Sequence, residues 1–328
     1  MALTDPYGRR LDYLRLSVTG GCNMKCRYCL IDDACGDAGR APASEEELLS
    51  IVRVLAGLGV RKVRITGGEP LLRPRLAALV GRLARIQPLR ELSLTTNGLL
   101  LAPQARRLKS AGLSRVNISL DTLKRDRFRA ITGGAGLPRV LAGIEASLKA
   151  GLDPVKINVV VMAKVNSDEI PDFVDLTRKL PVHVRFIELM PIGPASAFNQ
   201  SRWVPLGAMQ EKCGPLAPLP ARLGPKGNGP AVCYKSPGSL GSVGFISPLS
   251  EKFCGRCNRL RLTSAGVLLP CLAEQTGGED LLGLLRSGVK PQGLSAAVLR
   301  AVKHKAPCHR MCAGRLGLQT ASMCSVGG

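Results

Sequence analysis

The sequence lacks the features of several common classes of protein. No stretch of its 328 residues approaches the roughly 18 consecutive apolar residues that a membrane-spanning helix needs. Residues 1–12 contain no apolar core of the kind found in secretory signal peptides. No internal sequence repeat is evident. We therefore expect a cytoplasmic protein in a reducing compartment, without a membrane partner.

Acidic residues are scarce as well. The chain has 24 Asp and Glu against 46 Lys and Arg, which gives a formal net charge of +22. A surplus of this size favours polyanionic partners, either nucleic acid or a small phosphorylated substrate. The alternative is a surface that simply carries much arginine, because charge affects solubility and association but not fold.

The first half of the chain alternates between short β-rich segments and segments with helical periodicity. The expected strands are 12–19, 62–66, 91–95, 115–120, 154–162 and 183–188, and the expected helices are 44–58, 74–86, 103–111, 137–150 and 168–180. Ser44 and Glu47 match a capping box, and a glycine that favours a left-handed backbone follows three of the helices, at Gly59, Gly112 and Gly151. This alternation predicts an α/β fold, a partial (βα) TIM-like barrel of about six parallel strands.

The pattern changes near Met190. Residues 191–237 are rich in Pro and Gly and predict a long connecting region with some ordered structure. Beyond it we expect short strands at 243–246 and 260–262 and helices at 279–285 and 295–304. The prediction is therefore a barrel domain over residues 1–190 and a C-terminal α+β extension over residues 191–328.

Twelve cysteines in a reducing compartment indicate metal or redox chemistry rather than disulfides. Three of them, Cys22, Cys26 and Cys29, fall within eight residues directly after the first expected strand. Such density suits an iron–sulfur cluster or zinc. Three thiolates leave one iron of a four-iron cluster open, whereas structural zinc would need a fourth ligand such as Cys35, and the spacing argues against zinc.

A second group, Cys254, Cys257 and Cys271, has the spacing Cys-x2-Cys-x13-Cys. A zinc ribbon completed by Cys233, or an iron site closed by four cysteines, remains an alternative here. If residues 258–263 form a strand, its period of two places Arg259 and Arg261 on one face. Two guanidinium groups beside a metal would bind an anion, while the alternative is two solvated arginines.

The first cysteine group, with Tyr28 directly before the last cysteine, resembles the radical S-adenosylmethionine superfamily. The resemblance implies a four-iron cluster whose open iron chelates S-adenosylmethionine, which is cleaved to a 5′-deoxyadenosyl radical. Gly67 and Gly68, at the end of the second expected strand, would let the backbone approach a ligand without a Cβ in the way. Glu69 and nearby carbonyls would accept hydrogen bonds from an ammonium group.

Ordered motifs along nearly the whole chain are similar to those of the GTP 3′,8-cyclase family of molybdenum cofactor biosynthesis. They are residues 14–17, 22–29, 62–70, 95–98, 117–121, 186–191, 253–261 and 327–328. The resemblance implies conversion of GTP to (8S)-3′,8-cyclo-7,8-dihydroguanosine 5′-triphosphate, in which the adenosyl radical abstracts hydrogen from ribose C3′ and the carbon radical attacks guanine C8. The second cysteine group would hold another 4Fe-4S cluster, whose open iron binds the guanine.

The resemblance also implies roles for individual residues. The expected GTP contacts are Arg15, Arg64, Thr95, Lys156, Arg259 and Arg261, with Lys62 and Arg185 as further phosphate contacts. The expected S-adenosylmethionine contacts are Tyr28, Gly68, Ser119 and Met190, to which Glu69 is added on its chemistry. The expected catalytic groups are Arg15, Arg259, Arg261 and the Gly327-Gly328 tail, which would reach the active site.

The resemblance implies partners in the same way. They are an electron donor of flavodoxin or ferredoxin type and the downstream cyclic pyranopterin monophosphate synthase, and a homodimer is an option. Two other hypotheses compete. One is a radical enzyme that modifies RNA or a peptide, and the other is a zinc-stabilised nucleic-acid-binding protein without catalysis. The arginines within the second cysteine group and the Gly-Gly terminus favour the cyclase, since auxiliary clusters of peptide-modifying enzymes usually involve more cysteines. Cys308 and Cys312 are expected to be a chance pair, with a metal or redox site as the alternative, and the other cysteines are expected to be free thiols.

Overall fold

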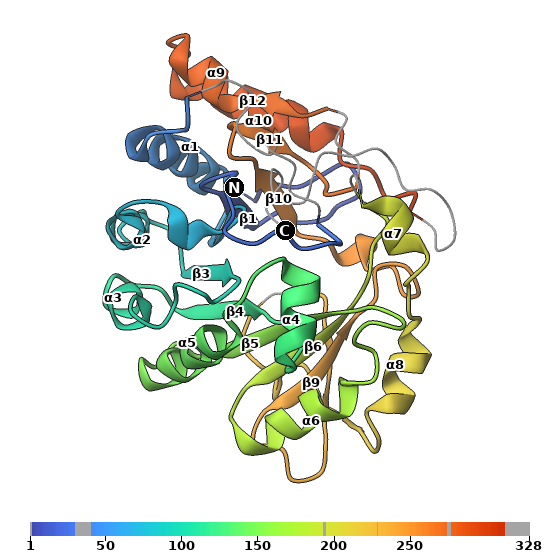
Figure 1. The fold of residues 1–328 in the computed structure, drawn as a ribbon. Coiled ribbons are helices and arrows are strands. Elements are labelled where there is room, and N and C mark those ends of the chain that lie inside the picture. The colour runs from blue at the N-terminus through green and yellow to red at the C-terminus, as the bar shows by residue number, and fades with distance from the viewer. Residues whose placement is uncertain (1, 30–40, 193–194, 228, 274–276, 312–328) are drawn as a thin grey trace.

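A single twelve-stranded sheet organises the molecule. The computed structural model describes residues 2–29, 41–192, 195–227, 229–273 and 277–311. Within that part of the chain the strand order is β12-β11-β10-β1-β2-β3-β4-β5-β6-β9-β8-β7. The eight strands from β10 to β9 run parallel, and antiparallel strands flank them at both edges. The sheet is open, which confirms the predicted partial barrel (Figure 1).

Six of the parallel strands come from the first half of the chain, where the sequence predicted them. They are β1 (Tyr13–Ser17), β2 (Lys62–Thr66), β3 (Glu91–Thr96), β4 (Arg115–Ser119), β5 (Val155–Val161) and β6 (His183–Glu188). The other two are β9 (Ser242–Ile246) and β10 (Arg259–Leu262). The edge strands are β7 (Ala217–Pro218), β8 (Val232–Lys235), β11 (Val267–Leu269) and β12 (Glu279–Asp280).

Helices cover the outer side of the sheet. In the first half they are α1 (Glu45–Leu58), α2 (Leu76–Ala84), α3 (Ala105–Ser110), α4 (Arg125–Thr132), α5 (Leu137–Lys149) and α6 (Ile170–Lys179). In the second half they are α7 (Ser196–Gln200), α8 (Leu206–Lys212), α9 (Leu281–Arg286) and α10 (Pro291–Lys303), and two short 3-10 helices are η2 (Pro70–Leu72) and η3 (Cys254–Arg256). Figure 1 shows α1, α2, α3 and α5 following one another along one side of the strands. None of the described helices is long and apolar enough to cross a membrane.

Local signals explain most of these boundaries. The Ser44 side chain accepts from the Glu47 backbone, and the Glu47 carboxylate accepts from the Ser44 backbone, so the predicted capping box is confirmed. Gly59, Gly112 and Gly151 all have positive φ, as expected after helices. The region 191–237 contains α7, α8, β7 and β8, which is the ordered structure expected there.

Two predictions of local structure were incomplete. Helix α4 was not predicted, because its eight residues carry four charges and only a short apolar face, Phe128 and Ile131. The segment 279–285 was predicted to be wholly helical, but it begins with β12, which pairs with β11 before α9 starts at Leu281. Strand pairing between distant segments overrides local helical preference at that point.

Alternation along the strands separates an apolar outer layer from a polar interior. In β1, Leu14 and Leu16 are fully buried in the core, while Arg15 between them faces the interior. The same alternation holds in β10, where Leu260 and Leu262 belong to the core and the intervening arginines line a pocket. The barrel interior is therefore lined by charged and polar side chains.

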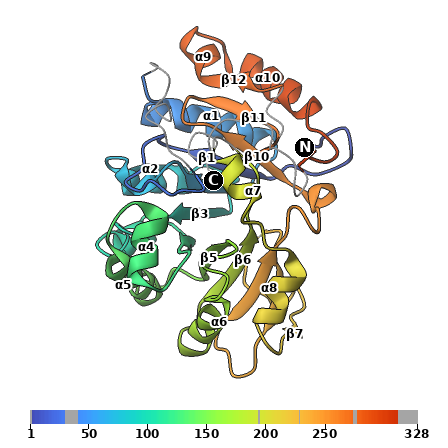
Figure 2. The ribbon, with the colours of Figure 1, turned by 45° about the vertical axis from the view of Figure 1, so that its right-hand side comes forward.

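The C-terminal extension completes the sheet on both sides. Strand β10 pairs in parallel with β1, in a register that sets Arg261 beside Arg15. Strand β9 pairs in parallel with β6. Helices α9 and α10 lie over β10, β11 and β12 in both views (Figures 1 and 2), and α10 also packs against α1. The two halves of the sequence thus build one continuous interior.

Candidate active site

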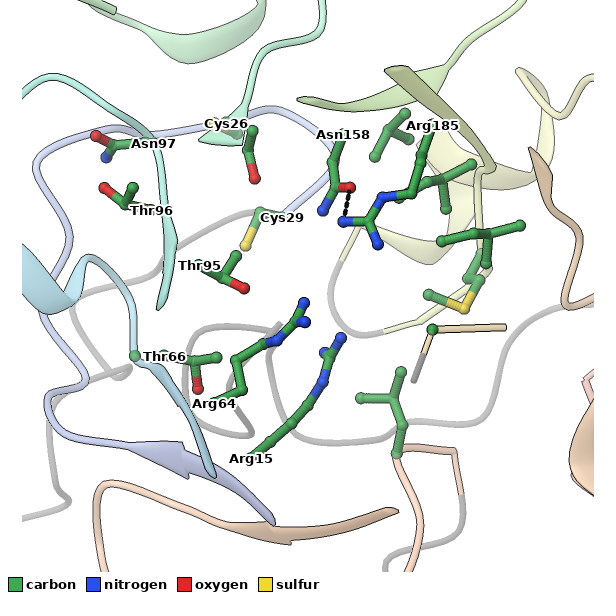
Figure 3. Close-up of a pocket in the computed structure, with 18 of the residues that line it drawn as sticks. Arg15, Cys26, Cys29, Arg64, Thr66, Thr95, Thr96, Asn97, Asn158 and Arg185 are labelled. Atoms are coloured by element: carbon green, nitrogen blue, oxygen red, sulfur yellow. Dashed lines mark hydrogen bonds between the residues drawn. The ribbon is translucent and has the colours of Figure 1, made fainter. Parts of the chain in front are cut away.

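One pocket contains the first cysteine group and many of the residues predicted for cofactor and substrate. Cys22, Cys26 and Cys29 all line it, on the loop that follows β1. The other predicted site residues in its wall are Arg15, Tyr28, Arg64, Gly68, Thr95, Ser119, Arg185, Met190, Arg259 and Arg261. Figure 3 shows Cys26 and Cys29 on one side of this space and arginines on the other.

Helix α4 supports the cysteine loop. The backbone N–H groups of Lys25 and Arg27 donate to the carbonyls of Thr132 (2.8 Å) and Ile131 (3.0 Å), at the carboxyl end of the helix. Helices leave their last carbonyls without internal partners, so this loop satisfies two of them. The helix that the sequence did not predict therefore fixes the position of the cluster-binding loop.

Gly67 and Gly68 allow close packing of two loops. The Gly68 N–H donates to Thr19 O, and the Glu69 N–H donates to Gly21 O, both at 2.8 Å. A Cβ on Gly68 would lie 2.3 Å from Gly21 O, and a Cβ on Gly67 would lie 2.6 Å from Thr19 O. The glycines are needed because the loop after β2 presses against the backbone that leads into the first cysteine.

Glu69 is not among the residues that line the pocket. Its carboxylate is fully buried and accepts from the Leu71 N–H (2.9 Å), the Thr96 hydroxyl (2.7 Å) and the Asn97 N–H (2.7 Å). Burial raises the pKa of Glu69 to about 7, although these three hydrogen bonds lower it. The structure thus gives this side chain the role of joining the loops after β2 and β3. The Asn97 amide in turn donates to the Cys22 sulfur at 3.8 Å.

Tyr28 and Asp121 form a pair at the carboxyl end of β4. The Tyr28 hydroxyl donates to Asp121 at 2.8 Å, and the same carboxylate accepts from the Val160 N–H. Burial raises the pKa of Asp121 to about 6. Asn199 of α7 donates to the carbonyls of both Tyr28 and Met190, which ties the extension to the cysteine loop. Asp121 was not assigned a role from the sequence, although its place directly after a strand was noticeable.

Guanidinium groups converge on the centre of the pocket. Figure 3 shows Arg15, Arg64 and Arg185 turned toward the same space from β1, β2 and β6. Arg185 donates to the Asn158 side chain at 2.6 Å. Asn117 accepts from both Arg64 and Arg185 when its amide oxygen faces these two arginines. Burial lowers the pKa of Arg64. Buried cations without enough acidic partners are unfavourable unless an anion binds among them.

Unsatisfied polar atoms support the same conclusion. In the described structure, Nε of Arg64, Nε of Arg185 and the hydroxyl of Thr95 are buried without a hydrogen-bond partner. Buried polar groups are normally paired, so such atoms in a pocket wall indicate a missing ligand. The donors that lack a partner suit a ligand rich in acceptor oxygens.

Two predicted substrate contacts lie outside the pocket wall. Lys62 stands at the start of β2, where its ammonium lies 3.8 Å from the Asp12 carboxylate. Lys156 of β5 is buried, and its ammonium donates to the carbonyls of Pro225 and Lys226. Burial, followed by the charge of Arg185, lowers the pKa of Lys156 to about 6.

The second cysteine group is brought together by a hairpin. Cys254 lies in η3 and Cys257 directly follows it, just before β10. Strand β11 runs antiparallel to β10 with Arg261 opposite Leu269, so Cys271 returns to the start of β10. Phe253 and Leu272, sequence neighbours of two of these cysteines, line the pocket. The group therefore borders the same pocket as the first one.

Two buried cations hold this second group in place. The Arg9 guanidinium forms an ion pair with Asp5 (2.6 Å) and donates to the carbonyls of Cys254, Ala306 and Pro307. The Lys305 ammonium, also buried, donates to the carbonyls of Arg259 and Pro270. Neither residue was predicted from the sequence. Arg9 contacts carbonyls at least 245 residues away in the chain, and Lys305 contacts carbonyls 46 and 35 residues away, so local patterns do not reveal these contacts.

The donor atoms of both groups are cysteine thiols, which are ligands of iron–sulfur clusters. In the part of the chain that the structure describes, no three His, Cys, Asp or Glu side chains converge as they would around one ion. A four-iron cluster needs no common point, because each thiolate binds a different iron. Burial raises the pKa of Cys22 and Cys26, so a bound cation is needed to keep them ionised. For Cys257 burial also raises the pKa, but Lys305 and Arg259 outweigh it and the pKa is lowered.

The zinc ligand proposed for the second group lies elsewhere in the sheet. Cys233 is on β8, opposite Gly244, and the charged groups that affect its pKa are Lys156 and Arg185. Gly327 and Gly328, together with Cys35, Cys312 and Cys324, lie outside the described residues.

Comparisons with known proteins agree with this geometry. Residues 16–177 match the family model described as "Radical SAM superfamily", and residues 182–311 match "Molybdenum Cofactor Synthesis C". The chain is 46% identical to a GTP 3′,8-cyclase of Moorella thermoacetica over 99% of this chain and 100% of the relative. It is 45% identical to a GTP 3′,8-cyclase of Pelotomaculum thermopropionicum over 95% and 96% of the two chains. Among solved structures, Streptococcus suis SuiB bound to S-adenosylmethionine shares the fold, with a TM-score of 0.56, 14% identity, and coverage of 89% of this chain and 69% of SuiB.

Proposed function

Since this chain belongs to the GTP 3′,8-cyclase family of radical S-adenosylmethionine enzymes, we propose that it converts GTP to (8S)-3′,8-cyclo-7,8-dihydroguanosine 5′-triphosphate in molybdenum cofactor biosynthesis. Membership confirms the resemblance predicted from the cysteine spacing and the ordered motifs. The observation that carries the proposal is a single pocket that joins a three-cysteine loop to a group of buried arginines. A radical source and a polyphosphate substrate need these two surfaces side by side.

Cys22, Cys26 and Cys29 are the residues that would hold the first 4Fe-4S cluster, which leaves one iron for S-adenosylmethionine. When bound, the cluster and S-adenosylmethionine together would supply a 5′-deoxyadenosyl radical. The chain contributes position: α4, the Gly67-Gly68 turn and Asn97 fix the cysteine loop. Tyr28, Gly68, Ser119 and Met190 line the pocket beside these cysteines and are our proposed S-adenosylmethionine contacts.

A second 4Fe-4S cluster, held by Cys254, Cys257 and Cys271, is also part of the proposal. The positive charge of Lys305 and Arg259 near these thiols favours their ionised form, which iron requires. Three thiolates leave an open iron that would take the guanine base of GTP. The hairpin of β10 and β11 supports this assignment, because it brings all three cysteines to the border of the pocket.

The arginines in the pocket are the proposed contacts of the triphosphate and ribose. Arg15, Arg64 and Arg185 converge on the pocket centre (Figure 3), and Arg259 and Arg261 join them from β10. A triphosphate supplies negative charge for this group and acceptor oxygens for the unpaired Nε atoms of Arg64 and Arg185. Lys156 lies behind this layer and would add its charge once a phosphate approaches. Lys62, whose ammonium lies 3.8 Å from the Asp12 carboxylate at the start of β2, is the remaining proposed phosphate contact.

The remaining assignments follow from the family. We propose that residues 1–190 act as the radical-generating barrel and residues 191–328 as the extension that holds the substrate cluster and the Gly327-Gly328 tail. A reductant of flavodoxin or ferredoxin type would supply the electron, and cyclic pyranopterin monophosphate synthase would take the product. A homodimer is compatible with this scheme.

Anaerobic turnover tests the proposal directly. Protein with both clusters restored is incubated with dithionite, S-adenosylmethionine and GTP. We expect 5′-deoxyadenosine that depends on GTP, together with a cyclised nucleotide. Formation of 5′-deoxyadenosine with unchanged GTP would instead favour a radical enzyme acting on RNA or a peptide. A protein that holds zinc and no iron would favour the nucleic-acid-binding alternative.

A further inference from the structure

Tyr13 is a pocket residue that the family motifs did not bring to attention. It is the first residue of β1, and only 2% of its surface is exposed. Its ring lines the pocket, and the Arg64 guanidinium lies over the ring at 5.6 Å from the centroid. Its hydroxyl is buried and has no hydrogen-bond partner in the described structure.

The charged groups that act most strongly on this hydroxyl are guanidinium groups. Those that act on it belong to Arg64, Arg15, Arg259 and Arg115. A guanidinium carries donors and no acceptor, so none of these neighbours can accept the phenol proton. Burial raises the pKa of Tyr13, but these four cations outweigh burial and leave the pKa below that of an ordinary phenol. The hydroxyl is therefore a strengthened donor that needs an acceptor from outside the protein.

We propose that the Tyr13 hydroxyl donates a hydrogen bond to a phosphate oxygen of the substrate and positions the triphosphate among the arginines. This inference rests on the proposed function, because it takes GTP as the ligand of the pocket. A phosphate is favoured over the base since four cations around one hydroxyl attract an anion more strongly than a neutral purine.

The position of Tyr13 in the strand places it beside Arg259 and away from the first cysteine loop. The cysteine loop follows the carboxyl end of β1, whereas Tyr13 stands at the amino end of this five-residue strand. At about 3.3 Å per residue, the two ends lie about 13 Å apart. The hydroxyl is thus remote from the radical source and near the arginine layer. A contact remote from the reacting carbon contributes equally to ground state and transition state, so it affects KM rather than kcat.

The test uses Tyr13→Phe, which removes only the hydroxyl and keeps the ring under Arg64. Binding of GTP, GMP and guanosine is measured by equilibrium dialysis on anaerobic protein with its clusters restored, for wild type and variant. We expect GTP binding to weaken by about tenfold to a hundredfold, the range for a hydrogen bond to a charged group. Guanosine binding should stay within about twofold. In turnover, KM for GTP should rise by the same factor while kcat changes little.

Tyr234→Phe is the matched control. Tyr234 lies on β8, outside the pocket wall, and its hydroxyl accepts from Gln210 at 3.4 Å within the described residues. Loss of the Tyr234 hydroxyl should change neither the affinity for GTP nor the KM for GTP. Iron content and thermal midpoint are recorded for both variants, so that a folding defect is recognised. Equal GTP binding by wild type and Tyr13→Phe overturns the inference, as does an equal loss for GTP and guanosine. If the wild type itself binds no GTP, the proposed function fails instead.

Discussion

At the scale of single residues, the barrel interior is dominated by buried basic side chains. Arg64, Lys156, Arg185 and Arg261 are each about 4% exposed. Arg115 pairs with Glu91, but the others have few acidic neighbours. Such a layer is costly in the empty protein and becomes favourable when a polyanion binds. Binding of a polyanion should therefore shift the pKa values of these side chains and stabilise the folded protein.

Lys156 makes that coupling measurable. Its pKa is lowered to about 6, so it is mostly neutral in the empty protein at pH 7.5, and a nearby phosphate restores its charge. GTP binding should then take up close to one proton above pH 6, and affinity should fall as pH rises beyond that value. Titration calorimetry in buffers of different ionisation enthalpy measures the uptake. Lys156→Met should abolish it, and an identical uptake in variant and wild type would contradict this assignment.

Arg259 tests the arginine layer itself. Arg259 lines the pocket and is the first residue of β10, two residues after Cys257. Arg259→Ala should lower kcat/KM for GTP by about a hundredfold, because a charged hydrogen bond is lost. Iron content should remain about eight per chain. Arg53→Ala, on the exposed face of α1, is the control and should behave as wild type. Unchanged turnover in Arg259→Ala would remove that residue from the site.

At the scale of elements, the cysteine loop depends on neighbours that contribute no ligand. The loop is held by the end of α4 on one side and by the turn after β2 on the other. Sequence motifs identified the turn, but the reason expected for its glycines was approach to a ligand. The structure shows that these glycines also contact the backbone of residues 19–21 and that both line the pocket.

Gly68→Ala should therefore displace the first cysteine loop. The added Cβ would meet Gly21 O at 2.3 Å and Gly20 O at 2.6 Å, and neither backbone atom can move freely. Iron should fall from about eight to about four per chain, with the second cluster retained. Gly57→Ala in α1 meets nothing within 4 Å and should keep both clusters while stabilising the helix by about 0.5–1 kcal/mol. Full iron content in Gly68→Ala would show that the loop tolerates the contact.

Removal of the Lys305 side chain should disturb the second cysteine group, as Gly68→Ala should disturb the first. Lys305→Met leaves the carbonyls of Arg259 and Pro270 without their donor, at a cost of about 1–3 kcal/mol for each buried group. The thermal midpoint should fall, and the electron paramagnetic resonance signal that responds to GTP should weaken or vanish. Lys303→Met, exposed on α10, is the matched control. A GTP-responsive signal of full intensity in Lys305→Met would rule out this positioning role.

At the scale of the whole molecule, local patterns predicted the barrel and the cysteine groups well. Strands β2 and β6 begin and end at the predicted residues, because alternation and flanking turns are local signals. The pairing of β10 with β1 and of β9 with β6 was not predicted, since it joins segments that lie far apart in the chain. Contacts between segments far apart in the chain, such as those of Arg9 and Tyr13, were missed for the same reason.

The central claim is that this pocket directs a radical from S-adenosylmethionine to ribose C3′ of GTP. The most direct measurement is the mass of 5′-deoxyadenosine formed from GTP deuterated at C3′, under anaerobic reducing conditions. We expect 5′-deoxyadenosine that carries one deuterium. Product without deuterium, formed while GTP is consumed, would contradict it.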